Sequence, residues 1–144
     1  EDKKVVLEEF INGFEVECAV MGNDEPVAAE VGEVITAVEF YDYDAKYNSP
    51  DSQTIIPAGM PKEKRDAIRA QAVKIYKTLG CEGLSRVDFF VDKENGEILF
   101  NEINTIPGFT PISMYPKLFE AVGVSYSETI NRLINLALDR GGKI

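Results

Sequence analysis

Histidine is absent from this sequence of 144 residues, and cysteine occurs only twice. Without histidine, these residues cannot carry histidine-based acid–base catalysis, a Ser-His-Asp triad or a histidine metal site. Cys18 and Cys81 are far apart and form no CxxC pair, so we interpret them as buried or half-buried thiols rather than as zinc ligands or a redox pair. No apolar run approaches the roughly 18 residues of a membrane span.

Basic residues are also scarce, with 15 Lys and Arg against 25 Asp and Glu, a net charge of −10. Binding to nucleic acid requires clustered cations, so nucleic acid and anionic membranes are excluded as expected partners. The composition is 44% hydrophobic and 28% charged, as in ordinary soluble proteins. The length predicts one domain. A strand pattern at Val5-Val6-Leu7 begins with no lead-in, so we expect a chain cut from a longer protein.

Hydrophobic periodicity predicts an antiparallel meander followed by helices, an α+β fold in which an antiparallel sheet packs against helices. The expected strands cover residues 4–10, 14–21, 26–31 and 34–41. Residues 42–60 are irregular, and we interpret them as a lid over a binding site, with a solvated connector as the alternative.

Three helices are predicted, over residues 61–79, 113–122 and 125–140. Pro61 fits the first helical turn and Gly80 the C-terminal stop. The expected apolar stripe of the first helix is Ile68, Ala72, Ile75 and Leu79. In the last helix, Ser125 and Glu128 have the spacing of a capping box, and the apolar stripe comprises Leu133, Leu136 and Ala137.

The most informative pattern is a hairpin around Asn95-Gly96, a strong turn signal between apolar runs. A turn centred there places Asp88 opposite Glu102 and Arg86 opposite Asn104, all on one face. The opposite face would be apolar, formed by Val87, Phe89, Val91, Leu99 and Ile103.

Two carboxylates and an amide oxygen form a hard-oxygen set that suits Mg²⁺, and a guanidinium suits phosphate oxygens. The hairpin therefore predicts a phosphoryl-transfer centre. The alternative is a polar outer face in which Arg86 and Asp88 form a surface ion pair. Residues 105–111 contain two prolines and a glycine and follow this face directly, so their backbone amides are well placed to meet an anion.

Six ordered segments of the chain resemble the carboxy-terminal part of D-alanine–D-alanine ligases, which are ATP-grasp enzymes. These segments are Glu8-Glu9-Phe10-Ile11-Asn12-Gly13-Phe14-Glu15, Tyr41-Asp42-Tyr43-Asp44-Ala45-Lys46-Tyr47, Pro57-Ala58-Gly59, Leu79-Gly80-Cys81, Ser85-Arg86-Val87-Asp88 and Asn101-Glu102-Ile103-Asn104-Thr105-Ile106-Pro107-Gly108. The resemblance implies that residues 1–14 end a central subdomain and form the adenine hinge. Residues 15–144 would be the carboxy-terminal catalytic domain.

The resemblance also implies individual roles. The metal ligands would be Asp88, Glu102 and Asn104, holding two Mg²⁺ ions, which Mn²⁺ could replace, on the phosphates of ATP. The catalytic residues would be Arg86, Gly108, Tyr47 and Ser113. The nucleotide would contact Glu8, Phe10, Ile11, Glu15, Lys46 and Asn101. Ser113 and Met114 would border the second amino acid, and the lid would carry Lys46 and Tyr47.

The implied activity is ATP-dependent joining of two D-alanines through an acyl phosphate, for peptidoglycan precursor synthesis in the cytoplasm. The alternatives are D-alanine–D-serine or D-alanine–D-lactate ligases of the vancomycin-resistance type, or another ATP-grasp carboxylate–amine ligase. Partners would be ATP and D-amino acids, and the parent protein would be a homodimer. The family's amino-terminal domain and two phosphate-binding lysines are missing, so we expect this chain alone to be inactive. Thr110-Pro111, where relatives often carry Thr-Ser, is a further departure.

Overall fold

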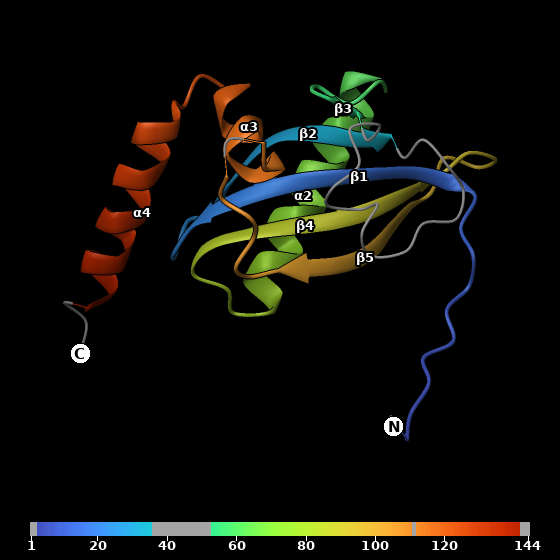
Figure 1. Ribbon diagram of the computed structural model, residues 1–144, viewed down its shortest axis with the longest axis horizontal. Helices are drawn as coiled ribbons and strands as arrows, with labels where there is room; N and C mark the ends of the chain where they lie inside the picture. Colours follow the sequence, from blue (N-terminus) through green and yellow to red (C-terminus); the bar gives the residue numbers. More distant parts are fainter. Residues whose placement is uncertain (1–2, 36–52, 111, 142–144) are drawn as a thin grey trace.

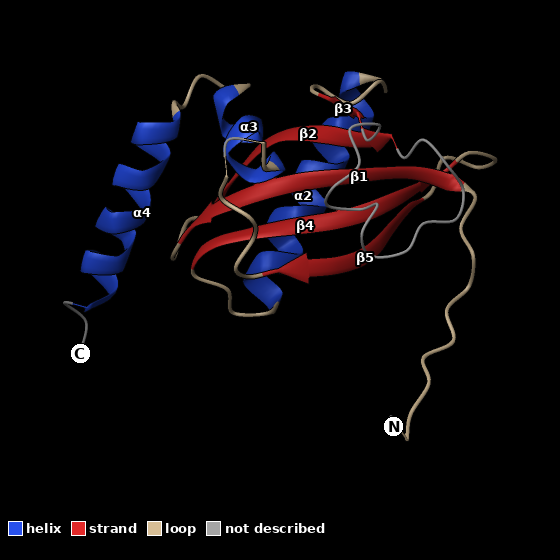
Figure 2. Cartoon of the chain, viewed as in Figure 1, coloured by secondary structure: helices blue, strands red, loops and turns tan. Residues whose placement is uncertain are grey.

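One antiparallel sheet forms the centre of the fold, with helices on both faces (Figures 1 and 2). The computed structural model describes residues 3–35, 53–110 and 112–141. Its strands are β1 (Gly13–Gly22), β2 (Val27–Ile35), β3 (Gln53–Ile55), β4 (Gly83–Asp92) and β5 (Ile98–Asn104), in the order β3-β2-β1-β4-β5. Its helices are α2 (Lys62–Thr78), α3 (Met114–Glu120) and α4 (Tyr126–Gly141). The expected antiparallel sheet with packed helices is confirmed. No helix within the described ranges is long and apolar enough to cross a membrane.

Side chains alternate between the two faces along β1, so this strand contributes to two separate cores, one on each face of the sheet. Val16, Cys18 and Val20 are fully buried in the core under α2. Ala19 and Met21 point the other way, into the core that α3 closes with Met114, Tyr115, Leu118 and Phe119. Burial raises the pKa of the Cys18 thiol to about 12, so this cysteine is a neutral core residue, as interpreted from the sequence. Cys81 is half-buried.

Two strand predictions are wrong. Residues 4–10 form no strand, and Val5, Val6, Leu7 and Phe10 are 79–94% exposed. Apolar residues hold a strand only where a neighbouring strand pairs with it, and within the described residues β1 begins only at Gly13. The second error is the break between the strands predicted at 26–31 and 34–41, because β2 runs unbroken through Gly32 to Ile35. Residues 36–41 lie outside the described residues. In addition, β3 lies within residues 42–60, which were expected to be irregular.

Gly32 is required for packing rather than for a turn. A Cβ at this position would lie 2.9 Å from Leu118 Cδ2 and 2.9 Å from Met114 Cε. The glycine thus lets α3 approach the sheet closely. This explains why a glycine that suggests a strand break in the sequence lies inside a continuous strand.

Helix α2 packs across the sheet on the face opposite α3. Its N-cap is Pro61, and Gly80, with φ +65°, follows its last turn, as predicted. The buried residues are Ile68, Ala72 and Tyr76, whereas Leu79 is 57% exposed. The buried stripe of α2 therefore follows i, i+4, i+8 spacing from Ile68 to Tyr76. The Tyr76 hydroxyl donates to the Gly22 carbonyl at 2.7 Å. Leu79 lies outside it because it is the C-cap residue beyond the last helical turn.

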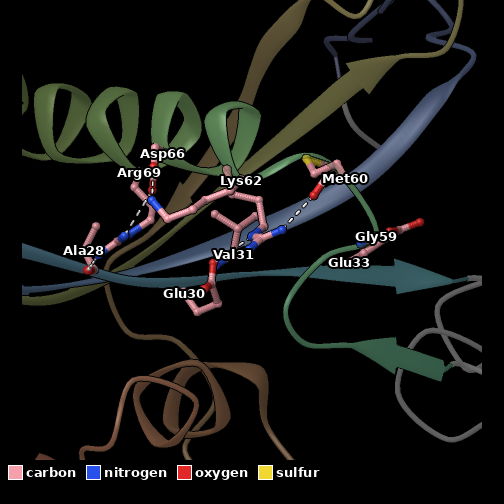
Figure 3. A network of polar contacts seen from close by, with 10 residues as sticks. Ala28, Glu30, Val31, Glu33, Gly59, Met60, Lys62, Asp66 and Arg69 are labelled. Carbon is pink, nitrogen blue, oxygen red and sulfur yellow. Dashed lines mark hydrogen bonds and ion pairs between the residues drawn. The ribbon is translucent and has the colours of Figure 1, made fainter.

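Polar contacts also attach α2 to β2 (Figure 3). Arg65 Nε lies 3.2 Å from Glu30 Oε1, and Arg65 donates to the Met60 carbonyl at 2.7 Å. Arg69 donates to the Ala28 carbonyl at 3.1 Å. These bonds partly compensate half-buried charges at the edge of the α2 core, where Arg69 Nε is buried without a hydrogen-bond partner among the described residues.

Helices α3 and α4 are both confirmed, with slightly later starts than predicted. The Glu128 amide donates to Ser125 Oγ at 3.2 Å, as the capping spacing predicts. Leu133 and Leu136 pack against the α3 core. Ala137 is exposed, so the predicted stripe is wrong at this position. It follows Leu136 directly in the sequence, and its side chain points away from the face of α4 that contacts α3.

Replacing Gly32 should destabilise the protein in proportion to side-chain size. Overpacking costs about 1–3 kcal/mol in a well-packed core. We expect a smaller loss for Gly32→Ala, since the methionine and leucine tips can shift, and a larger one for Gly32→Val, although valine favours strands. Urea unfolding measures both, with Gly141→Ala as the control because nothing lies within 4 Å of that position. A neutral Gly32→Val would contradict the close approach of α3.

Candidate active site

The β4–β5 pair brings the predicted polar residues together on the sheet face that also carries α3. Asp88 pairs with Glu102, and Arg86 pairs with Asn104, in the register expected from the sequence. Opposite residues of an antiparallel pair share a face, so the four side chains form one group. We call this group, together with Glu17 introduced below, the charged face.

The pairing changes by one residue beyond Asp88. A bulge lies between Asp88 and Phe89, after which Phe89 pairs with Phe100 and Phe90 with Leu99. The shift makes the prediction for Leu99 wrong, because Ile98 packs against the α2 core in its place. The other core predictions hold, with Val87, Phe89 and Val91 buried and Ile103 packed against them.

Arg86 and Asp88 form a two-pronged ion pair within β4. Arg86 Nε donates to Asp88 Oδ1 at 2.8 Å, and Arg86 NH2 donates to Asp88 Oδ2 at 2.7 Å. Asn104 Nδ2 lies 3.0 Å from Asp88 Oδ2 and 3.2 Å from Glu102 Oε1, so the amide joins the two carboxylates. Asp88 is only 2% exposed, so its charge depends on these two charge-assisted hydrogen bonds rather than on water.

A third carboxylate, from β1, belongs to the same group. Glu17 lies directly opposite Asp88 in the β1–β4 register, and its Oε2 is 3.1 Å from Arg86 Nε. It is 7% exposed. Sequence reasoning missed Glu17 as a site residue. The sequence alternates Glu15 and Glu17 with apolar residues, a pattern that places both on one face of a strand, but only the pairing of β1 with β4 brings that face to Arg86.

The charges of the group keep Arg86 ionised. Burial pulls the pKa of Arg86 down, but the hydrogen bond with Asp88 and the charges of Glu17, Asp88 and Glu102 outweigh it, so the pKa is raised. Arg86 is therefore a permanent, well-anchored cation, as recognition of a phosphate oxygen requires.

The donor set fits a hard divalent cation in chemistry. Asp88 and Glu102 supply carboxylate oxygens, and Asn104 supplies an amide that already holds both of them. Among the described residues, no three Asp, Glu, Cys or His side chains form a ready-made metal cluster. The fit therefore depends on Asn104 presenting its Oδ1 as third ligand, in place of the Nδ2 that now donates to both carboxylates. It also depends on Asp88 sharing the oxygens that Arg86 now contacts.

The loop after β5 is organised by Ser113, the N-cap residue of α3. Thr110 N donates to Ser113 Oγ at 2.9 Å, and Ser113 N donates to the Thr110 carbonyl at 2.9 Å. A Cβ on Gly108 would lie 3.0 Å from Ser113 Oγ, so the glycine permits this tight loop. Met114 is 7% exposed and packs in the α3 core.

The other predicted residues are spread around the charged face. Glu8 and Phe10 are exposed in the irregular segment before β1, and Ile11 is half-buried at its end. Glu15 lies on β1, opposite Phe90 of β4. Asn101 is exposed on β5, beside the bulge. Lys46, Tyr47 and Pro111 lie outside the described residues.

Comparison with known proteins gives the family. A family model described as "D-ala D-ala ligase C-terminus" matches residues 1–135. The D-alanine–D-alanine ligase of Acetivibrio thermocellus is 60% identical over 139 residues, which are 96% of this chain and 37% of the relative. The chain thus spans little more than a third of the length of that relative.

Solved structures agree with this result. The VanG D-Ala:D-Ser ligase from Enterococcus faecalis matches with a TM-score of 0.79 and 48% identity, over 89% of this chain and 37% of that chain. The D-alanine–D-alanine ligase from Bacillus anthracis, solved with ATP, matches with a TM-score of 0.74 and 29% identity, over 94% and 43%. The fold is that of the carboxy-terminal part of ATP-grasp ligases. The chain belongs to the D-alanine–D-alanine ligase C-terminal family.

Removing Arg86 should cost far more stability than removing an exposed arginine with an equally short ion pair. Arg86→Met removes a cation that contacts two buried carboxylates, a loss of about 3–5 kcal/mol. The control is Arg132→Met, because Arg132 Nε lies 2.8 Å from Glu128 with both side chains 47% exposed. Such a pair contributes about 0.5 kcal/mol. Denaturant unfolding compares the two variants, and equal losses would show that burial of the Arg86 group adds nothing.

Proposed function

We propose that the protein containing this chain is an ATP-dependent ligase that joins two D-alanines through an acyl phosphate. In this proposal, residues 1–14 end the central subdomain and form the adenine hinge, and residues 15–144 form the carboxy-terminal catalytic domain. The enzyme would act in the cytoplasm as a homodimer. The chain by itself would be inactive, because the first D-alanine and the ATP phosphates need residues outside it.

One observation carries the proposal: Arg86, Asp88, Glu102 and Asn104 converge on one face of the β4–β5 pair. The convergence of a fixed cation with hard oxygen ligands suits phosphoryl transfer, in which positioning and charge stabilisation supply most of the catalysis. Family membership narrows the reaction to carboxylate–amine ligation.

Four residues of the charged face would have defined tasks in this reaction. Asp88, Glu102 and Asn104 would hold Mg²⁺, as two ions, with Mn²⁺ as a substitute. When bound, the metal supplies positive charge to the phosphate oxygens of ATP. Arg86 would hold the transferring phosphate and then the acyl phosphate, since charge develops on their oxygens. The Gly108 amide would donate to the tetrahedral oxyanion formed when the second amine attacks.

The remaining roles lie around this centre. Glu8, Phe10, Ile11, Glu15 and Asn101 would contact the nucleotide, and Lys46 and Tyr47 would belong to a lid that excludes water from the acyl phosphate. Ser113 and Met114 would border the second substrate. Because Met114 is almost completely buried, we assign it to the wall behind the substrate, and Ser113 to the shape of the Gly108 loop.

D-serine is the alternative second substrate. The VanG D-Ala:D-Ser ligase is a structural relative at 48% identity. The D-alanine–D-alanine ligase of Acetivibrio thermocellus is more similar, at 60% identity, and favours D-alanine. Substrate tests must therefore include both amino acids.

Phosphate release by the full-length protein tests the reaction and the substrate together. With ATP and Mg²⁺, we expect release with D-alanine alone, because D-alanine serves as both acceptor and donor. Release only after D-serine or D-lactate is added would assign the protein to the resistance-type ligases. No release with any of these amino acids would refute the proposed reaction. The isolated 144-residue chain, assayed in parallel, should release none.

Glu102→Gln tests the metal assignment. Loss of one carboxylate charge should lower kcat/KM for ATP by about 100-fold or more, since charge at the phosphates is stabilised mainly there. The unfolding midpoint should change little, because Glu102 is exposed. Glu128→Gln on α4 is the matched control with unchanged turnover. Full activity of Glu102→Gln would remove Glu102 from the proposed metal site.

A further inference from the structure

Arg86 lies between two buried carboxylates from different strands. Asp88 binds both prongs of the guanidinium, at 2.8 and 2.7 Å. Glu17, from the neighbouring strand β1, approaches the same Nε atom at 3.1 Å. Arg86 therefore contacts one carboxylate that the proposed function assigns to the metal and a second one to which it assigns no role.

A second buried carboxylate at this position is costly. Glu17 is 7% exposed and Asp88 is 2% exposed, so neither charge is screened by bulk water. Taking an ion out of water costs several kcal/mol unless a partner compensates it. Both carboxylates lie against the same guanidinium, Glu17 at 3.1 Å and Asp88 at 2.7 Å. Because a buried ion pair is weak evidence for stability, the second carboxylate points to a role in function.

Metal binding would change which carboxylate can remain in contact with Arg86. Both Asp88 oxygens now accept hydrogen bonds from Arg86, and Asn104 adds a third contact to Oδ2. A divalent cation that takes an Asp88 oxygen would weaken the hold of Asp88 on Arg86. Glu17 has no such conflict, because it is anchored on β1, on the side of β4 away from Glu102.

We propose that Glu17 is a positioning residue that holds Arg86 in place when Asp88 binds the metal. The inference rests on the proposed function, since it requires Asp88 as a metal ligand and Arg86 at the transferring phosphate. Glu17 itself touches neither substrate nor metal. Its charge keeps the guanidinium oriented and makes the departure of Asp88 from Arg86 less costly, so it supports both metal binding and the chemical step.

Glu17→Gln in the full-length enzyme is the first test, since glutamine keeps the shape and removes the charge. At saturating Mg²⁺ and ATP, kcat should fall about tenfold or more, while KM for D-alanine stays within about twofold. The matched control is Glu30→Gln. Glu30 also pairs with an arginine, Arg65, at 3.2 Å and 21% side-chain exposure, but on the α2 side of the sheet (Figure 3). Glu30→Gln should lose stability and keep its kcat. An unchanged kcat in a folded Glu17→Gln protein would overturn the proposal.

The double variant tests whether Glu17 acts through Arg86. If it does, Glu17→Gln should have no further effect on kcat once Arg86→Lys is present, because coupled residues are not additive. Lysine keeps the positive charge that the buried carboxylates need, so the protein should stay folded. Independent, multiplying losses of kcat would contradict a role through Arg86.

Calorimetry gives a measurement that needs no turnover. Glu17→Gln should weaken binding of ADP with Mg²⁺ by about fivefold or more, and leave metal-free ADP binding unchanged. An equal loss with and without Mg²⁺ would indicate a general structural defect and overturn the proposal. Metal-dependent ADP binding without any phosphate release in the unchanged protein would refute the ligase function alone. Absence of metal-dependent binding in the unchanged protein would overturn both.

Discussion

The pairing of β1 with β4 is the constraint on which the rest of the structure depends. Ten consecutive partners, from Gly13 with Asp92 to Gly22 with Gly83, pair without a bulge. Side chains alternate between the faces, so a slip of one residue would exchange the α2 core with the charged face. The same register places Glu17 opposite Asp88. It also brings together, in the α2 core, the apolar residues Val16, Cys18, Val20, Val87, Phe89 and Val91.

The buried charged residues of the sheet lie together on one part of one face. The α2 face is closed by apolar side chains, whereas the opposite face divides into the α3 core and the charged face. Glu17 and Asp88 both form ion pairs with Arg86. The two carboxylates therefore share one guanidinium, and each favours its charged form.

The comparison of sequence with structure shows which signals are local. The α2 boundaries followed from Pro61 and Gly80, and the pairing of Asp88 with Glu102 followed from the Asn95-Gly96 turn, because these features act over a few residues. Three errors have non-local causes. Leu99 was expected in the core, but the bulge after Asp88 puts Ile98 there instead. A strand break was expected near Gly32, but this glycine lies inside β2 and makes room for α3. A strand was expected over residues 4–10, but no neighbouring strand pairs with them.

The sequence by itself determined the two-residue period of the strands, the helix ends and the family, because each depends on residue order alone. It also determined that Arg86, Asp88, Glu102 and Asn104 share a face, because a hairpin is a local structure. Only the tertiary structure decided that β1 lies beside β4. That contact joins residues far apart in the chain, and it brings Glu17 to Arg86, which no short-range pattern specifies.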